Sequence, residues 1–194
     1  MSHLLRELVD LGRPSSDRVA PFDAIAVVED VARLLRRDPR GEGVEIDVEA
    51  DASASRPLCS ARDRVTQVLV NLGLNALDAL QGSGSLRFRA GAAPTGDGLR
   101  LVVSDSGPGM PPDIADHAFD PFYTTKPPGQ GSGLGLFVSE GIVRGLGGQL
   151  ELETQTRPSA PDAREPGQPT GSTFVVTLPW CGCGRCARPG GRDG

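Results

Sequence analysis

The sequence predicts a domain of the α/β class, because helical and strand-like segments are mixed along it. Apolar residues recur at helical spacing in three segments of the main body, residues 24–37, 60–80 and 133–146. Strand-like segments, several of them alternating apolar with polar residues, occupy residues 44–49, 85–90, 99–104, 149–154 and 172–178. With 194 residues, 38% of them hydrophobic, the chain suits one domain with appendages and can fill a core. This order of elements agrees with an α/β sandwich without selecting it among α/β architectures.

Charge and hydropathy restrict the classes of partner. Net charge is −5, and no basic block lies beside a run of aromatic residues, which argues against nucleic acid as the main partner. No apolar run approaches the ~20 residues that a membrane helix needs, and no signal peptide opens the chain. We therefore expect a soluble, cytoplasmic polypeptide with no membrane segment.

The two ends of the chain resemble appendages. Residues 3–11 form an amphipathic helical pattern that stops at Gly12-Arg13-Pro14, so residues 1–14 look like the end of a longer helix. Three cysteines crowd the tail, 181–194. A zinc site usually needs four ligands and no nearby histidine completes one, so we favour a flexible tail with oxidisable thiols. The main domain is expected over residues 15–180.

The elements of the main domain follow from local signals. Asp23 is a plausible N-cap for the helix at 24–37, and Ser60 with Asp63 resembles a capping box for the helix that runs to Leu80. On that second helix, four polar residues share one face: Gln67, Asn71, Asn75 and Asp78. Asparagine is a poor helix former, so this stripe is either a solvent face or a face turned to a ligand such as Mg²⁺.

Two glycine-rich turns decide between these alternatives. The hairpin of residues 85–90 and 99–104 ends in the first turn, Asp105–Met110, and the second turn, Gly129–Leu136, opens the helix at 133–146. Backbone amides without crowding side chains at a helix N-terminus form an anion site. Asp105 could accept a hydrogen bond from an adenine amino group, although a turn-capping aspartate is common. Both turns, with the asparagine face, predict a nucleotide site.

The segment 108–133 has little periodicity and many glycines and prolines, so we expect a mobile lid. In it, Lys126 and Ser132 could face phosphates, and Phe119 with Phe122 would anchor the lid to the body of the domain. The alternative is a surface loop with two buried aromatic residues. Residues 157–170 are a proline-rich linker that we expect to be mobile.

Four motifs in order resemble the catalytic and ATP-binding domain of two-component sensor histidine kinases, within the gyrase/Hsp90/histidine kinase/MutL ATPase superfamily. QVLVNLGLNALDAL resembles the N box, DSGPGM the G1 box, FDPFYTTK the F box and GQGSGLGL the G2 box. The resemblance covers roughly residues 21–179, and residues 1–14 resemble the end of the second helix of the dimerisation and phosphoacceptor domain. It implies a two-layer α/β sandwich of the Bergerat type, a mixed sheet packed under helices with a mobile ATP lid.

The resemblance also implies ligands and residue roles. ATP and Mg²⁺ are the expected cofactors, with Asn75 as metal ligand, Asn75 and Lys126 as catalytic residues, and Asp105 on the adenine amino group with support from Thr173 through water. The residues expected to contact the nucleotide are Asn71, Asn75, Asp78, Asp105, Gly107, Gly109, Lys126, Gly131, Ser132, Gly133, Leu134, Gly135, Leu136 and Thr173.

Two departures from the family pattern shape the expected function. The helix with the phosphoacceptor histidine is missing, so we expect transfer of the ATP γ-phosphate to a histidine-bearing dimerisation domain upstream or on another chain, for relay to a response regulator receiver domain. A homodimer is expected only with those helices. In the resemblance, the position of Gln67 is similar to that of the glutamate that activates water in the ATPase branches, and an amide is no general base. Alternatives are a non-catalytic nucleotide-binding or interaction module and, less favoured, a serine kinase or a conformational ATPase.

Overall fold

The computed structural model of the protein describes residues 18–127, 131–156 and 170–180. The predicted helix at 3–11, most of the linker at 157–170 and the cysteine-rich tail lie outside these residues.

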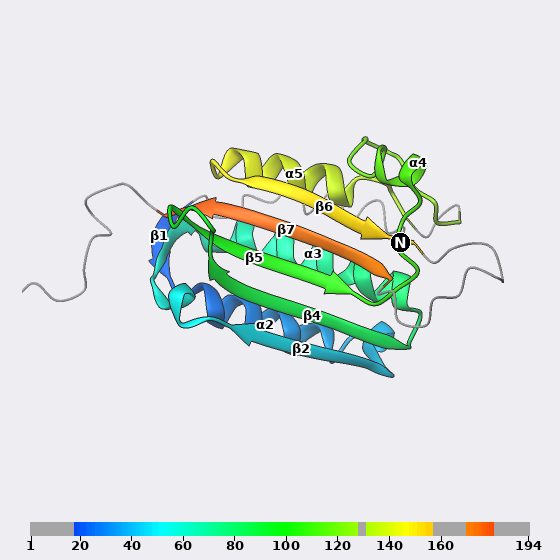
Figure 1. Ribbon diagram of the computed structural model, residues 1–194, viewed down its shortest axis with the longest axis horizontal. Helices are drawn as coiled ribbons and strands as arrows, with labels where there is room; N and C mark the ends of the chain where they lie inside the picture. Colours follow the sequence, from blue (N-terminus) through cyan, green and yellow to red (C-terminus); the bar gives the residue numbers. More distant parts are fainter. Residues whose placement is uncertain (1–17, 128–130, 157–169, 181–194) are drawn as a thin grey trace, which may run out of the picture.

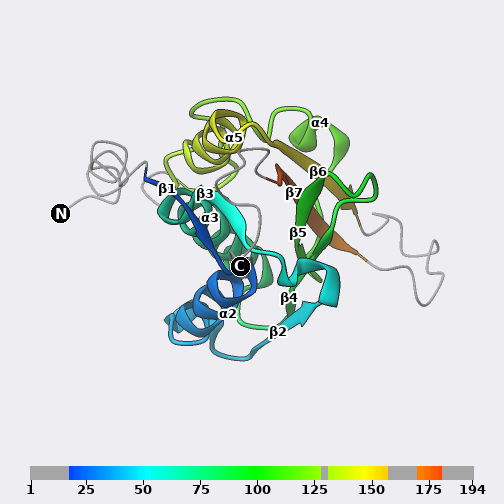
Figure 2. The same ribbon diagram turned by 90° about the vertical axis from the view of Figure 1, so that its left-hand side faces the viewer.

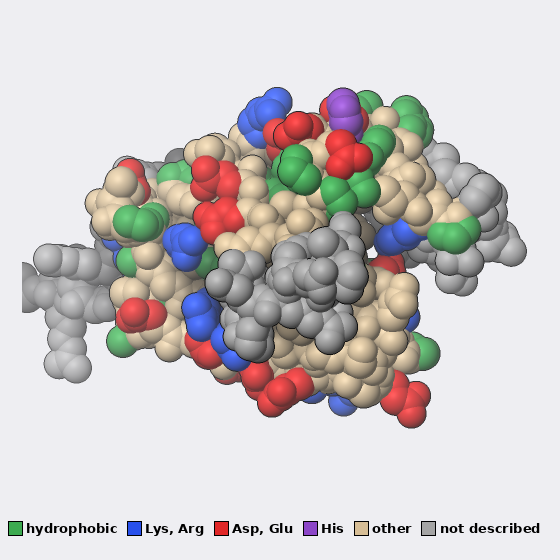
Figure 3. All heavy atoms as spheres, turned by 45° about the vertical axis from the view of Figure 1, so that its right-hand side comes forward, with side chains coloured by type: hydrophobic (Ala, Val, Ile, Leu, Met, Phe, Trp, Pro, Cys, Tyr) green, Lys and Arg blue, Asp and Glu red, His purple; other side chains and the backbone are tan. Residues whose placement is uncertain are grey.

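Figure 3 shows one face of the molecule, on which basic side chains lie in small separate groups among acidic ones. No helix among the described residues is both long and apolar enough to cross a bilayer.

A five-stranded mixed sheet forms one layer of the domain (Figure 1). Its strand order is β2-β4-β5-β7-β6, with β2 parallel to β4 and the other neighbours antiparallel. The bounds are Val44–Ala50 for β2, Gly84–Ala92 for β4, Gly98–Asp105 for β5, Gln149–Gln155 for β6 and Gly171–Pro179 for β7. All five predicted strands are present, and β4 with β5 forms the predicted hairpin.

Three helices cover one face of this sheet and form the second layer (Figure 2). They are α2 (Ala24–Leu35), α3 (Arg62–Leu80) and α5 (Gly135–Gly145). The predicted N-cap of α2 is confirmed, because Asp23 Oδ1 accepts hydrogen bonds from the amides of Ile25 (2.9 Å) and Ala26 (3.3 Å). The fold is therefore a two-layer α/β sandwich.

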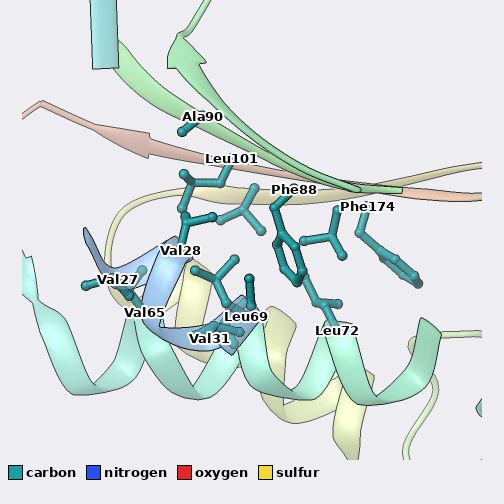
Figure 4. Packing of buried hydrophobic residues seen from close by; sticks show 14 of the residues in the cluster. Val27, Val28, Val31, Val65, Leu69, Leu72, Phe88, Ala90, Leu101 and Phe174 are labelled. Carbon is teal, nitrogen blue, oxygen red and sulfur yellow. The ribbon is translucent and has the colours of Figure 1, made fainter. Parts of the chain in front are cut away.

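The apolar core lies between these layers (Figure 4). Side chains of α2 and α3 point toward the inner face of the sheet, where Phe88 of β4, Leu101 of β5 and Phe174 of β7 meet them. Burial of each large apolar side chain contributes about 1.5–3 kcal/mol. The helical contributions come mainly from Val28, Val31, Val65, Leu69 and Leu72.

The start of α3 differs from the prediction. Its N-cap is Ala61, which makes no side-chain hydrogen bond to the first turn, so the capping box of Ser60 and Asp63 is wrong. Ser60 instead lies buried in β3 (Leu58–Ala61), which pairs antiparallel with β1 (Val19–Phe22). A strand that runs directly into the helix uses the serine for pairing rather than capping.

Candidate functional site

The polar face of α3 meets the start of α5. Asn71 Nδ2 donates to Ser139 Oγ at 2.8 Å, and the Ser139 side chain is buried. A Cβ on Gly135 would lie 2.6 Å from Asn71 Oδ1, so an alanine there would force the Asn71 amide to move. The contact brings the described part of the second glycine-rich turn, Gly131–Leu136, to the asparagine face.

The second glycine-rich turn leaves backbone amides free at the α5 N-terminus. Gly133 has φ +68°, and a Cβ there would lie 2.4 Å from the carbonyl carbon of Phe122. Ser132 Oγ accepts from the Leu134 amide at 3.2 Å, while the N-cap residue Leu134 gives no side-chain hydrogen bond to the helix. The first-turn amides, which include Gly135 and Leu136, therefore have no side-chain cap and suit an anion.

The two aromatic residues of the lid segment behave differently. Phe119 is half-buried and packs against the core, as predicted for an anchor. Phe122 is 72% exposed with φ +66°, so it does not anchor this segment by burial. Its amide donates to the Gly133 carbonyl at 2.9 Å, so its backbone rather than its ring is held. The segment also contains a short helix, α4 (Pro112–Ala115), which periodicity did not predict.

The carboxylate of Asp105 is fixed at the end of β5. Its Oδ1 accepts from the Gly107 amide at 2.8 Å and from the Ser172 amide at 3.3 Å. Its Oδ2 has no hydrogen bond to any described residue. Burial raises the pKa of Asp105, and the bonds from Gly107 and Ser172 oppose that rise. A fixed, half-buried carboxylate with one open oxygen suits a hydrogen-bond donor of a ligand.

Glycines allow the backbone to pass closely around Asp105. A Cβ on Gly107 would lie 2.7 Å from Asp105 Oδ1. Gly109 has φ +73°, and a Cβ there would lie 2.1 Å from the Gln155 carbonyl oxygen. The first glycine-rich turn therefore packs against both its own carboxylate and the end of β6.

Thr173 lies on the other face of the sheet from Asp105. The core-facing residues of β7 are Phe174, Val176 and Leu178, so by alternation Thr173 points away from the helices and Ser172 toward them. Thr173 Oγ1 lies 3.0 Å from Ser104 Oγ, whereas Ser172 is buried beside Asp105. The register makes Ser172, not Thr173, the neighbour of the carboxylate.

Asp78 forms ion pairs with two basic side chains. Lys126 Nζ lies 2.5 Å from Asp78 Oδ2, and Arg40 Nη1 lies 3.1 Å from Asp78 Oδ1. The sequence did not indicate Arg40, because it lies 38 positions away from Asp78 and belongs to none of the four motifs. Nor did it indicate Ser139, whose spacing from Asn71 gives no signal before the packing of α3 on α5 is known.

Asn75 is a candidate ligand for a metal ion. It is half-buried one helical turn after Asn71, and its side chain makes no hydrogen bond within the described part of the chain. Among the described residues no group of three or more His, Cys, Asp or Glu side chains could hold a metal ion. An amide oxygen suits Mg²⁺, which usually takes few protein ligands and completes its shell with phosphates and water. The residues therefore fit an ion that arrives with a polyphosphate.

Comparisons with known proteins agree with this geometry. The model of the histidine kinase-, DNA gyrase B- and HSP90-like ATPases matches residues 60–181. The two-component sensor PprA of Pseudomonas aeruginosa is 35% identical over 188 residues, which cover 92% of this chain and 18% of PprA. Sensor histidine kinase ZraS of Escherichia coli is 32% identical over 180 residues, which cover 92% of this chain and 35% of ZraS. The chain thus spans only a minor part of these relatives.

Solved structures show the same architecture. The nucleotide-free catalytic domain of histidine kinase ThkA has a TM-score of 0.68 at 27% identity, covering 84% of this chain and 96% of that domain. The mycobacterial sensor histidine kinase MprB has a TM-score of 0.65 at 25% identity, covering 84% of this chain and 97% of the other. The described residues have the fold of histidine kinase catalytic domains.

Proposed function

The chain belongs to the family of histidine kinase-, DNA gyrase B- and HSP90-like ATPases, and from this premise we propose that its site binds ATP with Mg²⁺ and transfers the γ-phosphate to a histidine. The observation that carries the proposal is the contact of Asn71 with Gly135, which joins the asparagine face of α3 to the uncapped amides of α5. A triphosphate with Mg²⁺ needs amide donors for its oxygens and an amide oxygen for the ion, and this contact brings the two side by side.

Asp105 is the proposed contact for the adenine base. With Oδ1 held by two backbone amides, Oδ2 is positioned to accept a hydrogen bond from the adenine amino group. Gly107 and Gly109 let the backbone pass close to the base. We assign the supporting hydroxyl to Ser172, because Thr173 points to the other face of the sheet.

The triphosphate is proposed to lie between α3 and the start of α5. Asn75 would hold the Mg²⁺, with Asn71 beside it, and the ion when bound neutralises phosphate charge in the transition state. Lys126 would bind the γ-phosphate. The second glycine-rich turn would contribute amides, with contacts from Gly131, Ser132, Gly133, Leu134, Gly135 and Leu136.

The phosphate acceptor is proposed to be an imidazole nitrogen on a histidine-bearing dimerisation domain. As the N–P bond forms, the bond between the γ-phosphorus and the bridging oxygen breaks and ADP leaves. A response regulator is the proposed final acceptor, in keeping with the sensor kinases among the relatives. Gln67 is half-buried one turn before Asn71. Because its amide cannot take a proton from water, transfer to a histidine is favoured over hydrolysis.

A calorimetric titration tests the site. ADP and a non-hydrolysable ATP analogue are titrated with and without Mg²⁺ into the parent chain, Asp105→Asn and the matched control Asp113→Asn, an exposed aspartate of α4. We expect the parent and the control to bind the analogue with Mg²⁺, and Asp105→Asn to lose binding about 100-fold, as expected when a buried polar contact is mispaired. Equal binding by Asp105→Asn would refute the adenine assignment, and a parent that binds neither nucleotide would refute the function.

A further inference from the structure

Asp78 presents a problem for the proposed site, because a carboxylate beside a triphosphate repels it. In the structure two cations offset its charge, Lys126 at 2.5 Å and Arg40 at 3.1 Å. The aliphatic part of Lys126 also lies against the second glycine-rich turn, since a Cβ on Gly131 would be 3.0 Å from Lys126 Cδ. The Lys126 side chain therefore contacts both Asp78 and the second glycine-rich turn.

The two cations differ in how firmly they are held. Arg40 is fixed by a fork of two hydrogen bonds to Asp38, from Nε to Oδ1 and from Nη2 to Oδ2, each 2.9 Å. Asp38 is itself held, because its Oδ1 also accepts from the Arg40 amide at 3.0 Å as N-cap of the short helix Pro39–Gly41. The hydrogen bonds that Arg40 donates to Asp38, together with its contact with Asp78, raise the pKa of Arg40 against the opposing effect of burial.

Lys126 has no comparable second anchor. Its ammonium pairs with Asp78 alone among the described residues, on a flexible four-carbon stem. A γ-phosphate with its negative charge can therefore draw the ammonium away from Asp78 by side-chain rotation. Arg40, fixed by its fork, cannot follow and stays on Asp78.

We propose that Arg40 is a positioning residue for ATP, which keeps Asp78 neutralised when Lys126 exchanges that carboxylate for the γ-phosphate. This inference rests on the proposed function of the site. Without Arg40, the exchange leaves an unpaired carboxylate beside the γ-phosphate. The repulsion between these two negative groups weakens the binding of ATP. ADP lacks the γ-phosphate and leaves Lys126 on Asp78, so its binding is insensitive to Arg40.

A double-mutant cycle on the full chain tests the proposal. Dissociation constants for ADP and a non-hydrolysable ATP analogue, both with Mg²⁺, are measured for the parent, Arg40→Gln, Asp78→Asn and the double variant. The matched control is Arg62→Gln, which breaks an exposed ion pair of the same length, 3.1 Å to Asp30. The readout is the ratio of the analogue constant to the ADP constant, because a general loss of structure changes both constants together.

We expect Arg40→Gln to raise this ratio about fivefold to tenfold, as coupling energies between contacting charges imply, and Arg62→Gln to leave it unchanged. In the Asp78→Asn background the same change should alter the ratio by less than about twofold, since no carboxylate remains to be neutralised. Arg40→Lys keeps a positive charge but cannot form the two-bond fork to Asp38, so it should restore only part of the parent ratio.

The proposal is overturned if Arg40→Gln leaves the ratio unchanged, or raises it equally with and without the Asp78 carboxylate. If Arg40→Gln does not fold, Asp38→Asn replaces it in the cycle, because it loosens the fork that holds Arg40. A parent that binds neither nucleotide refutes the proposed function instead, so the two failures are distinguishable.

Discussion

Asp105 is the residue where folding and binding are expected to conflict. Its carboxylate is partly withdrawn from water, and this burial raises its pKa. An asparagine at this position keeps an oxygen for the amides of Gly107 and Ser172 but has no charge to desolvate. We therefore predict that Asp105→Asn unfolds at a higher temperature than the nucleotide-free parent at neutral pH.

The raised pKa of Asp105 also predicts how the difference in stability between the two proteins changes with pH. Since the pKa of Asp105 is higher in the folded than in the unfolded chain, the parent loses stability as pH rises from its ordinary value of 3.8 through the raised one. The advantage of Asp105→Asn should thus be greatest above the raised pKa and shrink as pH falls toward 3.8. Melting temperatures of both proteins across this range check it, and an asparagine variant less stable than the parent at neutral pH contradicts it.

The motifs predicted which residues of the proposed site lie close together, because each motif folds as a local unit. Asp105 lies beside Gly107, and Asn71 lies beside Gly135. Ser172 was missed in favour of Thr173, because adjacent residues of a strand differ only in the face they point to. That choice depends on the register of β7 against β5, which involves residues about 70 positions apart.

Helices and strands whose apolar residues recur at regular spacing were predictable from the sequence, and elements without such spacing were not. The helices α2, α3 and α5 and the five sheet strands have clear patterns that burial of one face enforces. By contrast, β1 and β3 are four residues long and pair with each other although the paired residues, Val19 with Ala61 through Phe22 with Leu58, lie far apart in the sequence, and α4 is a single turn within the lid segment. Segments this short take their structure from the surrounding fold.

The packing of α5 on α3 yields a prediction at the scale of the element. Gly135 and Gly141 both lie in α5, but a Cβ on Gly135 would lie 2.6 Å from Asn71 Oδ1, whereas one on Gly141 would meet nothing within 4 Å. Gly141→Ala should stabilise the fold by about 0.5–1 kcal/mol through helix propensity and leave nucleotide binding unchanged. Gly135→Ala should displace the Asn71 amide and weaken ADP binding about tenfold.

The two variants serve as controls for each other. Thermal unfolding should show the propensity gain in Gly141→Ala, whereas in Gly135→Ala the contact with Asn71 opposes that gain. ADP titration reports the displacement of the Asn71 amide, which only Gly135→Ala causes. Equal ADP affinity in the two variants would show that the contact of Asn71 with Gly135 does not shape the site.

The whole molecule combines a proposed nucleotide site with the absence, among its described residues, of a helix pair that could present a phosphoacceptor. We therefore predict that the chain with ATP and Mg²⁺ phosphorylates the separately purified histidine-bearing dimerisation domain of a related sensor kinase. Labelled γ-phosphate should appear on that domain as phosphohistidine, which is lost in acid. Without the added domain, release of phosphate should stay near background, because Gln67 cannot activate water.

The same reaction separates the alternatives for this fold. An acid-stable label on serine or threonine would identify a serine kinase, and steady release of phosphate without an acceptor would identify a conformational ATPase. ADP binding without transfer to the added domain would leave a nucleotide-binding interaction module. Asn75→Ala is the control that ties any transfer to this site, because it removes the proposed Mg²⁺ ligand from a half-buried position of α3 where alanine favours the helix. Transfer that persists in that variant would place the metal on other residues.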